Sequence, residues 1–215
     1  MRVKENISLI YSDIPTSVVL VAVSKTISIE LIMEAYNSGH RVFGENKIQE
    51  MVGKWKSLPK DIEWHMIGHV QRNKVKYMAP FVSLIHGVDS LKLLIEINKQ
   101  AKKNNRIIDC LLQVHIAKEE TKHGFNDVEL DLAFNGSKTL ENISIKGLMG
   151  MATFTNNHSL IESEFKVLKS IFDIYKSKTD KFNILSMGMS GDYKTAINKG
   201  STMIRIGSKI FGKRS

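Results

Sequence analysis

The chain has few of the residues that mark extracellular or metal-binding proteins. Its 215 residues include one cysteine, Cys110, and three prolines. A single cysteine excludes an intrachain disulfide. Its place in the apolar run from Ile107 to Leu112 predicts a small buried hydrophobe rather than a reactive thiol. Histidine and cysteine do not cluster at metal-ligand spacing, so the sequence predicts no metal site.

Long hydrophobic runs and linker-like segments are also missing. No stretch approaches the roughly 20 apolar residues of a membrane-spanning helix, and no apolar segment of signal-peptide form follows the charged N-terminus. The sequence therefore predicts a cytoplasmic protein without membrane contact. Without low-complexity segments, the length fits one domain over residues 1–215.

The net charge of +9 favours anionic partners, either nucleic acid or a phosphorylated small molecule. The lysines are spread along the chain, however, with no dense basic tract that has interleaved aromatic residues. No motif of a nucleic-acid-binding module is present. We interpret most of this charge as solvated surface and do not predict nucleic-acid binding.

A short apolar run followed by a helical pattern recurs along the chain. After the run from Ser17 to Val23, apolar residues fall at helical spacing until Gly39. Ser90 is the expected N-cap of a helix to about Lys103, and an apolar stripe from Ile161 to Tyr175 predicts a long helix. The strand candidates are residues 17–23, 41–43, 63–67, 82–86, 107–114, 143–148, 182–185 and 202–206.

Strand candidates that alternate with helices predict a parallel α/β fold. Eight such units in roughly 200 residues fit a single compact (β/α)8 TIM barrel, with a doubly wound open sheet as the competing architecture. In a barrel, functional residues lie at the carboxyl ends of the strands, and phosphate is often held by the loops after strands seven and eight.

A lysine, Lys25, follows the first predicted strand directly. In a barrel it would enter a partly desolvated pocket. Desolvation lowers the pKa of an amine, and only the neutral amine attacks a carbonyl, so this is a candidate Schiff-base lysine. From position alone, a lysine whose amine simply reaches the surface is the alternative.

The loops after the last two predicted strands are rich in glycine and hydroxyl groups. They run from Ser186 to Asp192 and from Arg205 to Ser208. Their backbone N–H groups and serine side chains are suited to a phosphate dianion, although serine also caps ordinary βα loops. Pyridoxal enzymes place an acidic residue or an arginine against the pyridine nitrogen. Arg205 is a candidate for that role, and a structural salt bridge is the alternative.

Two further stretches are dense in polar groups: one follows the second predicted strand, and the other covers the third predicted strand and its loop. Asn46 lies in the loop after the second and is able to hydrogen-bond a cofactor. His65 alternates with apolar neighbours in the third, which favours a hydrogen-bonded interior histidine over a catalytic base.

The segments VAVSKT, FGENKIQE, EWHMIGHVQRNK, LSMGMSGD and GSTMIRIGSKIFG closely resemble the YggS/PROSC family of pyridoxal 5′-phosphate (PLP)-binding proteins of PLP homeostasis. The likeness runs from about Val18 to Gly212. It implies a fold type III barrel like the N-terminal domain of alanine racemase, with Lys25 as the Schiff-base residue and Arg205 at the pyridine nitrogen. It also implies that Ser190, Gly207 and Ser208 hold the phosphate and that Asn46 and Met187 line the ring.

Departures from the family pattern are small. The family often has Thr where Ser208 stands, which keeps the hydroxyl. His115 occupies a place where Asn is expected, so any role of that position is open, while the pattern of Lys122 and Gly124 is kept. Whether Lys74, Lys122 or another surface lysine binds a second PLP during delivery is open as well.

The resemblance implies a non-catalytic protein that buffers or delivers PLP, possible recipients being PLP-dependent apo-enzymes. The alternative is a PLP-dependent amino-acid racemase. Racemisation needs an acid/base on each face of the substrate α-carbon, and in related racemases a second domain helps to complete the site. Since the sequence ends at Ser215, just past the last predicted helix, we expect no such domain and no catalytic residue. We also expect a monomer, with which a compact barrel without extra elements is compatible. A basic rim that steers the anionic cofactor is a further hypothesis.

Overall fold

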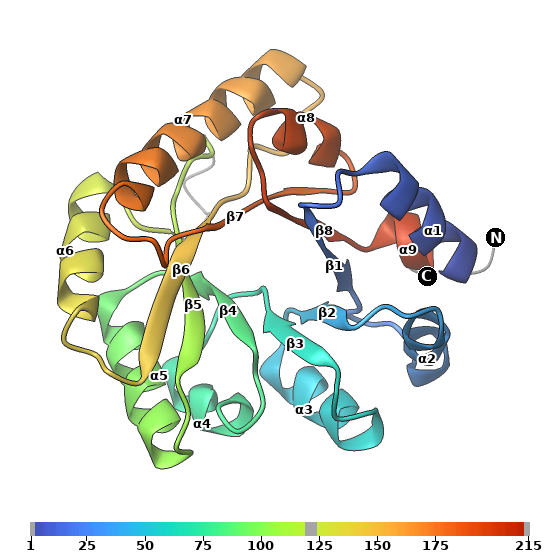
Figure 1. Cartoon of the computed structure of the whole chain (residues 1–215), viewed down its shortest axis with the longest axis horizontal. Helices are drawn as coiled ribbons and strands as arrows, with labels where there is room; N and C mark the ends of the chain where they lie inside the picture. The colour runs from blue at the N-terminus through green and yellow to red at the C-terminus, as the bar shows by residue number, and fades with distance from the viewer. Residues whose placement is uncertain (1–2, 119–123, 213–215) are drawn as a thin grey trace.

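A computed structural model describes residues 3–118 and 124–212 of the chain (Figure 1). In these residues, eight parallel strands form a closed barrel in chain order, and β1 also pairs with β8. The predicted TIM barrel is therefore confirmed, and the open sheet is wrong. The strands are β1 (Val19–Val23), β2 (Val42–Glu45), β3 (Glu63–Met66), β4 (Leu84–Val88), β5 (Ile108–Gln113), β6 (Ile143–Met149), β7 (Ile184–Met189) and β8 (Met203–Ile206).

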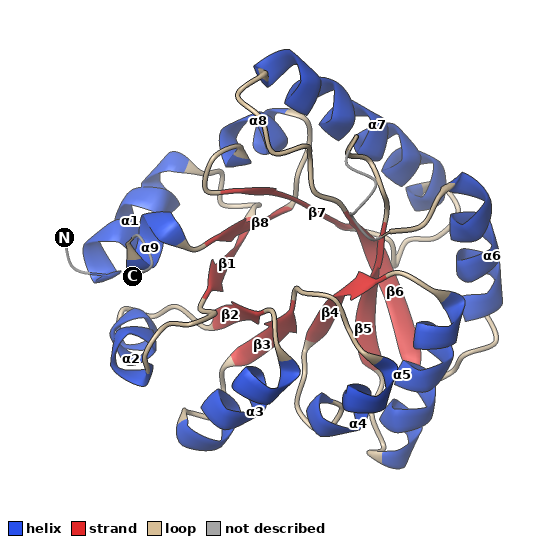
Figure 2. Ribbon diagram, turned by 180° about the vertical axis from the view of Figure 1, so that it is seen from behind, coloured by secondary structure: helices blue, strands red, loops and turns tan. Residues whose placement is uncertain are grey.

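The helices surround the strands on the outside (Figure 2). One of them, α1, precedes the first strand and lies beside α9, where Asn6 donates a hydrogen bond to the Ile210 carbonyl at 2.8 Å (Figure 1). The helices are α1 (Val3–Asp13), α2 (Ile29–Asn37), α3 (Ile48–Ser57), α4 (Val75–Met78), α5 (Leu91–Lys103), α6 (Asp127–Ser137), α7 (His158–Lys176), α8 (Tyr193–Asn198) and α9 (Ser208–Phe211), with a 3-10 turn at Arg72–Lys74.

All eight strand candidates are strands, and the predicted helix signals are confirmed. The Ser90 hydroxyl caps α5 by accepting from the Leu93 N–H, and α2 ends just before Gly39, whose φ is +98°. The main error in bounds is at β7, which continues to Met189 rather than ending at residue 185. Gly188 (φ +96°) lies within a register shift between β7 and β8, so a glycine-rich segment that reads as a loop belongs to an irregular strand.

Apolar side chains fill both sides of the barrel wall. The larger cluster lies between strands and helices, and a smaller one inside the barrel contains Val21, Leu84, Leu111, Met149 and Met203. Parallel strands covered on both faces in this way require the continuous apolar runs seen in the sequence.

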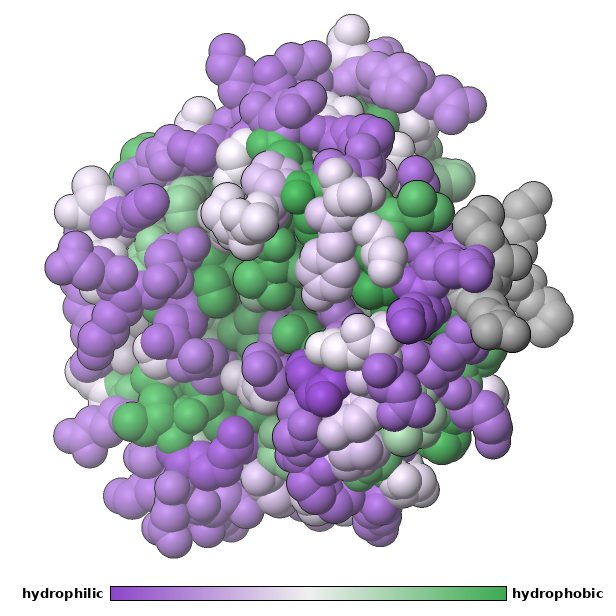
Figure 3. Space-filling model, turned by 45° about the vertical axis from the view of Figure 1, so that its right-hand side comes forward, coloured by the Kyte–Doolittle hydropathy of each residue, from purple (hydrophilic) through white to green (hydrophobic). Residues whose placement is uncertain are grey.

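Cys110 belongs to the larger cluster. It is fully buried, and burial raises the pKa of its thiol, as expected for a small hydrophobe. On the face of the molecule in Figure 3, hydrophilic residues are dispersed over most of the surface and hydrophobic ones gather toward its middle. Within residues 3–118 and 124–212, no helix combines the length and the apolar character needed to cross a bilayer.

Candidate functional site

A cavity of about 880 Å³ opens where the strands end, a size within the usual range for small-molecule sites. Its lining comes from both halves of the sequence: the ends of β1, β2 and β3, the loop after β6, the start of α7, and the ends of β7 and β8. The lining residues are Val23, Lys25, Asn46, Ile67, residues 151–156, His158, Ile161, residues 189–192, Arg205, Gly207 and Ser208.

Six of the seven predicted site residues line this cavity, namely Lys25, Asn46, Ser190, Arg205, Gly207 and Ser208. The expectation that Met187 lines a bound ring is the exception. Its side chain is fully buried in the cluster between strands and helices, and the methionine that lines the cavity here is Met189. Successive side chains of a strand point to opposite faces, and Ser186, next to Met187, points into the barrel.

Lys25 lies at a tight turn after β1. The Ile27 N–H donates to the Ser24 carbonyl at 3.0 Å, which leaves Lys25 and Thr26 at the two central positions. Thr26 has a φ of +63°, in the left-handed region that β-branched residues rarely adopt. Such strain costs about 1–3 kcal/mol and persists only where the surroundings hold it.

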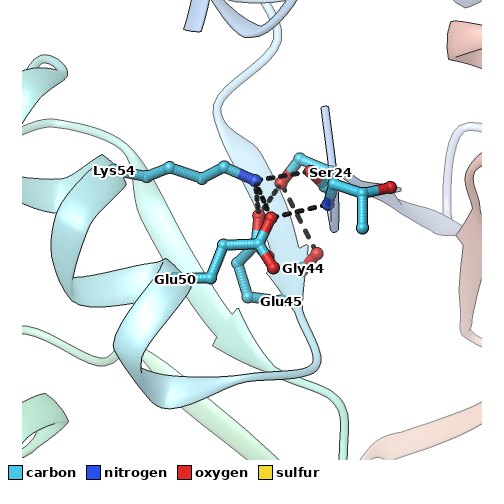
Figure 4. Close-up of polar contacts among 6 residues, drawn as sticks. Ser24, Gly44, Glu45, Glu50 and Lys54 are labelled. Atoms are coloured by element: carbon cyan, nitrogen blue, oxygen red, sulfur yellow. Dashed lines mark hydrogen bonds and ion pairs between the residues drawn. The ribbon is translucent and has the colours of Figure 1, made fainter. Parts of the chain in front are cut away.

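A buried cluster of charged side chains holds this turn (Figure 4). Glu50, on α3, accepts the Thr26 N–H at 2.6 Å through Oε1. Lys54, one turn further along α3, donates from Nζ to Glu50 Oε1 (2.6 Å), Glu45 Oε1 (2.8 Å) and the Ser24 carbonyl (2.6 Å). Ser24 also donates its hydroxyl to Glu45 Oε1 at 2.6 Å. The chain on both sides of Lys25 is therefore attached to one cluster.

The two carboxylates of this cluster have different environments. Burial raises the pKa of Glu45, although hydrogen bonds from Lys54 and Ser24 oppose the shift. Burial also acts to raise the pKa of Glu50, but hydrogen bonds from Lys54 and the Thr26 N–H, with the Lys54 charge, bring it below its usual value. Glu50 is therefore ionised at neutral pH.

The loops after β7 and β8 are joined to each other. The Gly207 N–H donates to Ser190 Oγ at 3.3 Å, and Asp192 Oδ1 accepts the Met189 N–H at 2.6 Å, which closes the first loop. These loops bring hydroxyl groups and backbone N–H groups to one side of the cavity, as predicted from their sequences. Such donors suit an anionic ligand.

Arg205 is nearly fully buried and starts a hydrogen-bonded chain across the barrel interior. It donates to Ser186 Oγ at 2.6 Å and to the Gly150 carbonyl at 3.1 Å. Ser186 Oγ lies 3.0 Å from His86 Nδ1, and His86 Nε2 lies 3.1 Å from His65 Nδ1. Both acceptors of Arg205 are uncharged, so the salt bridge considered from the sequence is not what the structure shows.

The protonation states along this chain follow from burial. Burial lowers the pKa of His65 to about 3 and that of His86 well below its usual value, so both imidazoles are neutral at pH 7. Burial also lowers the pKa of Arg205 to about 10, with the Asp192 charge opposing, and the guanidinium remains protonated. The predicted hydrogen-bonded interior role of His65 is confirmed.

Part of the cavity wall was missed by the sequence analysis. The loop after β6 contributes Met151 to Asn156, and α7 adds His158 and Ile161. The polar residues of that loop follow a predicted strand, so the rule that identified the other loops would have found them. The buried cluster around Lys54 was missed as well.

His115 and Lys74, whose roles the sequence left open, are not among the residues that line the cavity. His115, past the end of β5, donates its N–H to the Phe125 carbonyl at 3.1 Å and is not among the cavity-lining residues. Gly124 packs against it, because an added Cβ would lie 2.5 Å from the His115 nitrogen. Lys74 lies in the 3-10 turn, away from the cavity lining, and Lys122 is outside the described residues. Across the described ranges, no group of three or more His, Cys, Asp or Glu side chains could hold a metal ion.

Comparisons with known proteins agree with this geometry. The family model described as the N-terminal domain of alanine racemase matches residues 1–215. The pyridoxal phosphate homeostasis protein of Aquifex aeolicus is 40% identical over 200 residues, which cover 91% of this chain and 86% of that protein. A protein of the same name from Helicobacter pylori is 40% identical over 195 residues, or 89% and 86% of the two chains.

Solved structures show the same barrel. PipY of Synechococcus elongatus without PLP has a TM-score of 0.92 at 32% identity, over 98% of this chain and all of that one. The same protein with PLP bound has a TM-score of 0.89 at the same identity and coverage. An alanine racemase of Clostridium difficile is 13% identical with a TM-score of 0.81, over 99% of this chain and 56% of that one, a likeness of fold alone.

Proposed function

Because this chain belongs to the alanine racemase N-terminal domain family and, within it, to the pyridoxal phosphate homeostasis proteins, we propose that it binds PLP and acts in intracellular PLP homeostasis. It buffers or delivers the cofactor and carries out no catalytic turnover. The observation that carries the proposal is that a lysine from the turn after β1 and a buried arginine from β8, distant in sequence, line one cavity of suitable size.

The donor set of this cavity fits PLP, which has an aldehyde, a pyridine nitrogen and a phosphate. When bound, PLP supplies an aldehyde whose carbon takes up a neutral amine, with formation of a C=N bond and release of water. Lys25 is the amine that lines the cavity, and we assign it the Schiff base. Asn46, on the neighbouring strand end, is assigned a contact with the ring.

Ser190, Gly207 and Ser208 are assigned to the phosphate. The Gly207 N–H is already directed at Ser190 Oγ, so the two loops face each other at hydrogen-bond distance. Hydroxyl and N–H donors bind a dianion without adding charge of their own.

Arg205 is assigned to the pyridine nitrogen. Since its guanidinium keeps its protons at neutral pH, it donates a hydrogen bond to that nitrogen and does not provide a proton acceptor. An unprotonated pyridine is a weak electron sink, which suits a protein that holds the cofactor more than one that performs carbanion chemistry.

A racemase remains the second candidate, because the fold is shared with alanine racemases and the cavity also contains His158 and Asp192. The two candidates differ in one measurable property. A racemase exchanges the α-proton of an amino acid with deuterated solvent at a useful rate, whereas a PLP carrier does not. Nuclear magnetic resonance of alanine incubated with the PLP-loaded protein distinguishes them.

We also propose that the chain works as a single barrel domain, as a monomer in the cytoplasm, and that its recipients are PLP-dependent apo-enzymes. Static light scattering measures the oligomeric state. Transfer is measured as the recovery of activity by an apo-enzyme mixed with the loaded protein, compared with the same amount of free PLP.

The proposal is tested by locating bound PLP. The purified protein is loaded with PLP, its visible spectrum is recorded, and it is reduced with borohydride before peptide mass spectrometry. We expect a yellow protein with the pyridoxyl adduct on Lys25, and a colourless Lys25→Ala variant. The exposed Lys56→Met variant is the control and should bind PLP like the wild type. A protein that takes up no PLP, or an adduct scattered over surface lysines, would overturn the proposal.

A further inference from the structure

The buried cluster formed by Ser24, Glu45, Glu50 and Lys54 is not needed for any contact with PLP in the assignment above. We propose that Lys54 and Glu50 are positioning residues that hold the Lys25 turn in the orientation needed for Schiff-base formation. This inference rests on the proposed function, because it concerns the lysine assigned to the cofactor. None of the four cluster residues is among those that line the cavity.

The amine of Lys54 is held by three hydrogen bonds. An ammonium group has three N–H donors, and Lys54 uses them on three acceptors, the Ser24 carbonyl, Glu45 Oε1 and Glu50 Oε1. Its side chain is only 8% exposed, so water competes little for these bonds. Lys54 therefore fixes the relative positions of the end of β1, the end of β2 and the first turn of α3.

This geometry reaches Lys25 from both sides. On one side, Lys54 holds the carbonyl of Ser24, the residue before Lys25. On the other side, Lys54 holds Glu50 Oε1, and the same oxygen accepts the N–H of Thr26, the residue after Lys25. Figure 4 shows the Lys54 amine and the Glu50 carboxylate directed toward the Ser24 strand end.

The strained backbone next to Lys25 explains why such a clamp is required. Thr26 has a φ of +63°, which a threonine leaves readily unless its neighbours prevent it. If the Thr26 N–H loses its acceptor, the turn relaxes and the Lys25 side chain starts from a different backbone position. Reactions between a held amine and a held carbonyl are sensitive to such shifts.

A purely stabilising salt bridge is a poor account of the cluster. Buried ion pairs seldom add net stability, because desolvation offsets their attraction. Here Glu45 is fully buried, and its Oε2 atom has no hydrogen-bond partner among the described residues. Burial of the Glu45 carboxylate therefore has a desolvation cost. The cluster is better explained by its effect on the position of the Lys25 turn.

The experiment compares two ligands on four variants. One ligand is PLP, and the other is its 4′-deoxy analogue, which has a methyl group in place of the aldehyde and so cannot react with an amine. The variants are Glu50→Ala, Glu50→Gln, Lys54→Met and the exposed control Lys56→Met on the same helix. Stopped-flow absorbance gives the rate of Schiff-base formation, and fluorescence titration gives the affinity for the analogue.

We expect Glu50→Ala and Lys54→Met to slow Schiff-base formation by about tenfold to a hundredfold, with affinity for the analogue within about twofold of wild type. Glu50→Gln should recover most of the rate, because its amide oxygen still accepts the Thr26 N–H. After borohydride reduction, a larger share of the pyridoxyl adduct should lie on lysines other than Lys25. Lys56→Met should match the wild type in every measurement.

Two results would overturn the inference: an unchanged rate of Schiff-base formation in Glu50→Ala, or a loss of affinity for the analogue as large as the loss of rate, which a merely structural role would cause. Glu50 is 24% exposed, so Glu50→Ala is informative even if Lys54→Met does not fold. Failure of the proposed function is distinguishable, because then the wild-type protein would form no Schiff base at Lys25.

Discussion

Replacing His65 by asparagine should remove part of the acid sensitivity of the fold. His65 is buried and neutral, and its Nδ1 atom pairs with His86 Nε2 at 3.1 Å. The amide of an asparagine places a polar atom near the position of Nδ1, so the contact with His86 is kept while the titratable group is lost.

The size of the effect follows from the pKa difference between the folded and unfolded chain. Burial lowers the pKa of His65 from 6.5 to about 3 in the folded state. Between these values the unfolded chain binds the extra proton, so the free energy of unfolding falls as the pH falls through this window. Integrated from about pH 7 to about pH 5, one such histidine accounts for about 2 kcal/mol.

The assay is urea unfolding of the PLP-free protein, followed by far-ultraviolet circular dichroism at both pH values, for wild type and His65→Asn. The carboxylates are present in both proteins and cancel in the comparison, and burial, the main cause of the low pKa of His86, acts in both. The wild type should lose about 2 kcal/mol more than the variant on acidification. Equal losses in the two proteins would refute the assignment of His65 as a buried neutral group.

Three further predictions concern glycines and the arginine contact, and each is measured as a change in the free energy of urea unfolding. Gly53→Ala should stabilise by about 0.5–1 kcal/mol, because α3 has open space there and alanine is the better helix former. Gly68→Ala should destabilise, by about 1–3 kcal/mol, because the new Cβ would lie 2.5 Å from the Asn46 carbonyl oxygen. Ser186→Ala should cost about 2–4 kcal/mol, because it leaves both a guanidinium N–H of Arg205 and His86 Nδ1 buried without this partner. A neutral Ser186→Ala, or equal effects at the two glycines, would contradict these readings.

The fold could be predicted from the sequence because its signals are local. Strands buried on both faces appear as short apolar runs, and helices between them appear as stripes at helical spacing, as from Ile161 to Tyr175 in α7. The prediction was less accurate at β7, where Gly188 at φ +96° interrupts the register with β8. A glycine that allows a strand irregularity cannot be told from a glycine in a loop by composition alone.

The candidate site could be predicted where a residue type and a strand end coincide. Lys25, Ser190 and Arg205 satisfy that rule, and the structure brings them to one cavity. Met187 is the predicted residue that does not line the cavity, because its side chain is buried in the cluster between strands and helices, and the irregularity of β7 hid that face from the sequence pattern. The loop after β6 was omitted although its position made it predictable.

The Lys54 cluster shows what sequence patterns do not contain. On α3, Glu50 and Lys54 are four residues apart, a spacing that usually indicates a solvent-exposed ion pair of small effect. Their importance here comes from Glu45 and Ser24, which belong to two different strand ends, and from the burial that those strands impose. The parallel pairing of β1 with β2 and the packing of α3 behind them bring these elements together. The sequence spacing alone therefore indicates an ordinary ion pair, whereas the structure shows contacts to both sides of the Lys25 turn.

Both groups assigned to PLP chemistry are thus held by buried polar contacts of different kinds. Arg205 is held by uncharged hydrogen-bond acceptors, the Ser186 hydroxyl and the Gly150 carbonyl, and its guanidinium stays protonated. The Lys25 turn is held through its backbone, at the Ser24 carbonyl and the Thr26 N–H. Each group is thus fixed by contacts from elements other than its own: Arg205 by β7 and the residue after β6, and the Lys25 turn by α3. The position of both groups at the cavity therefore depends on the packing of neighbouring elements of the barrel.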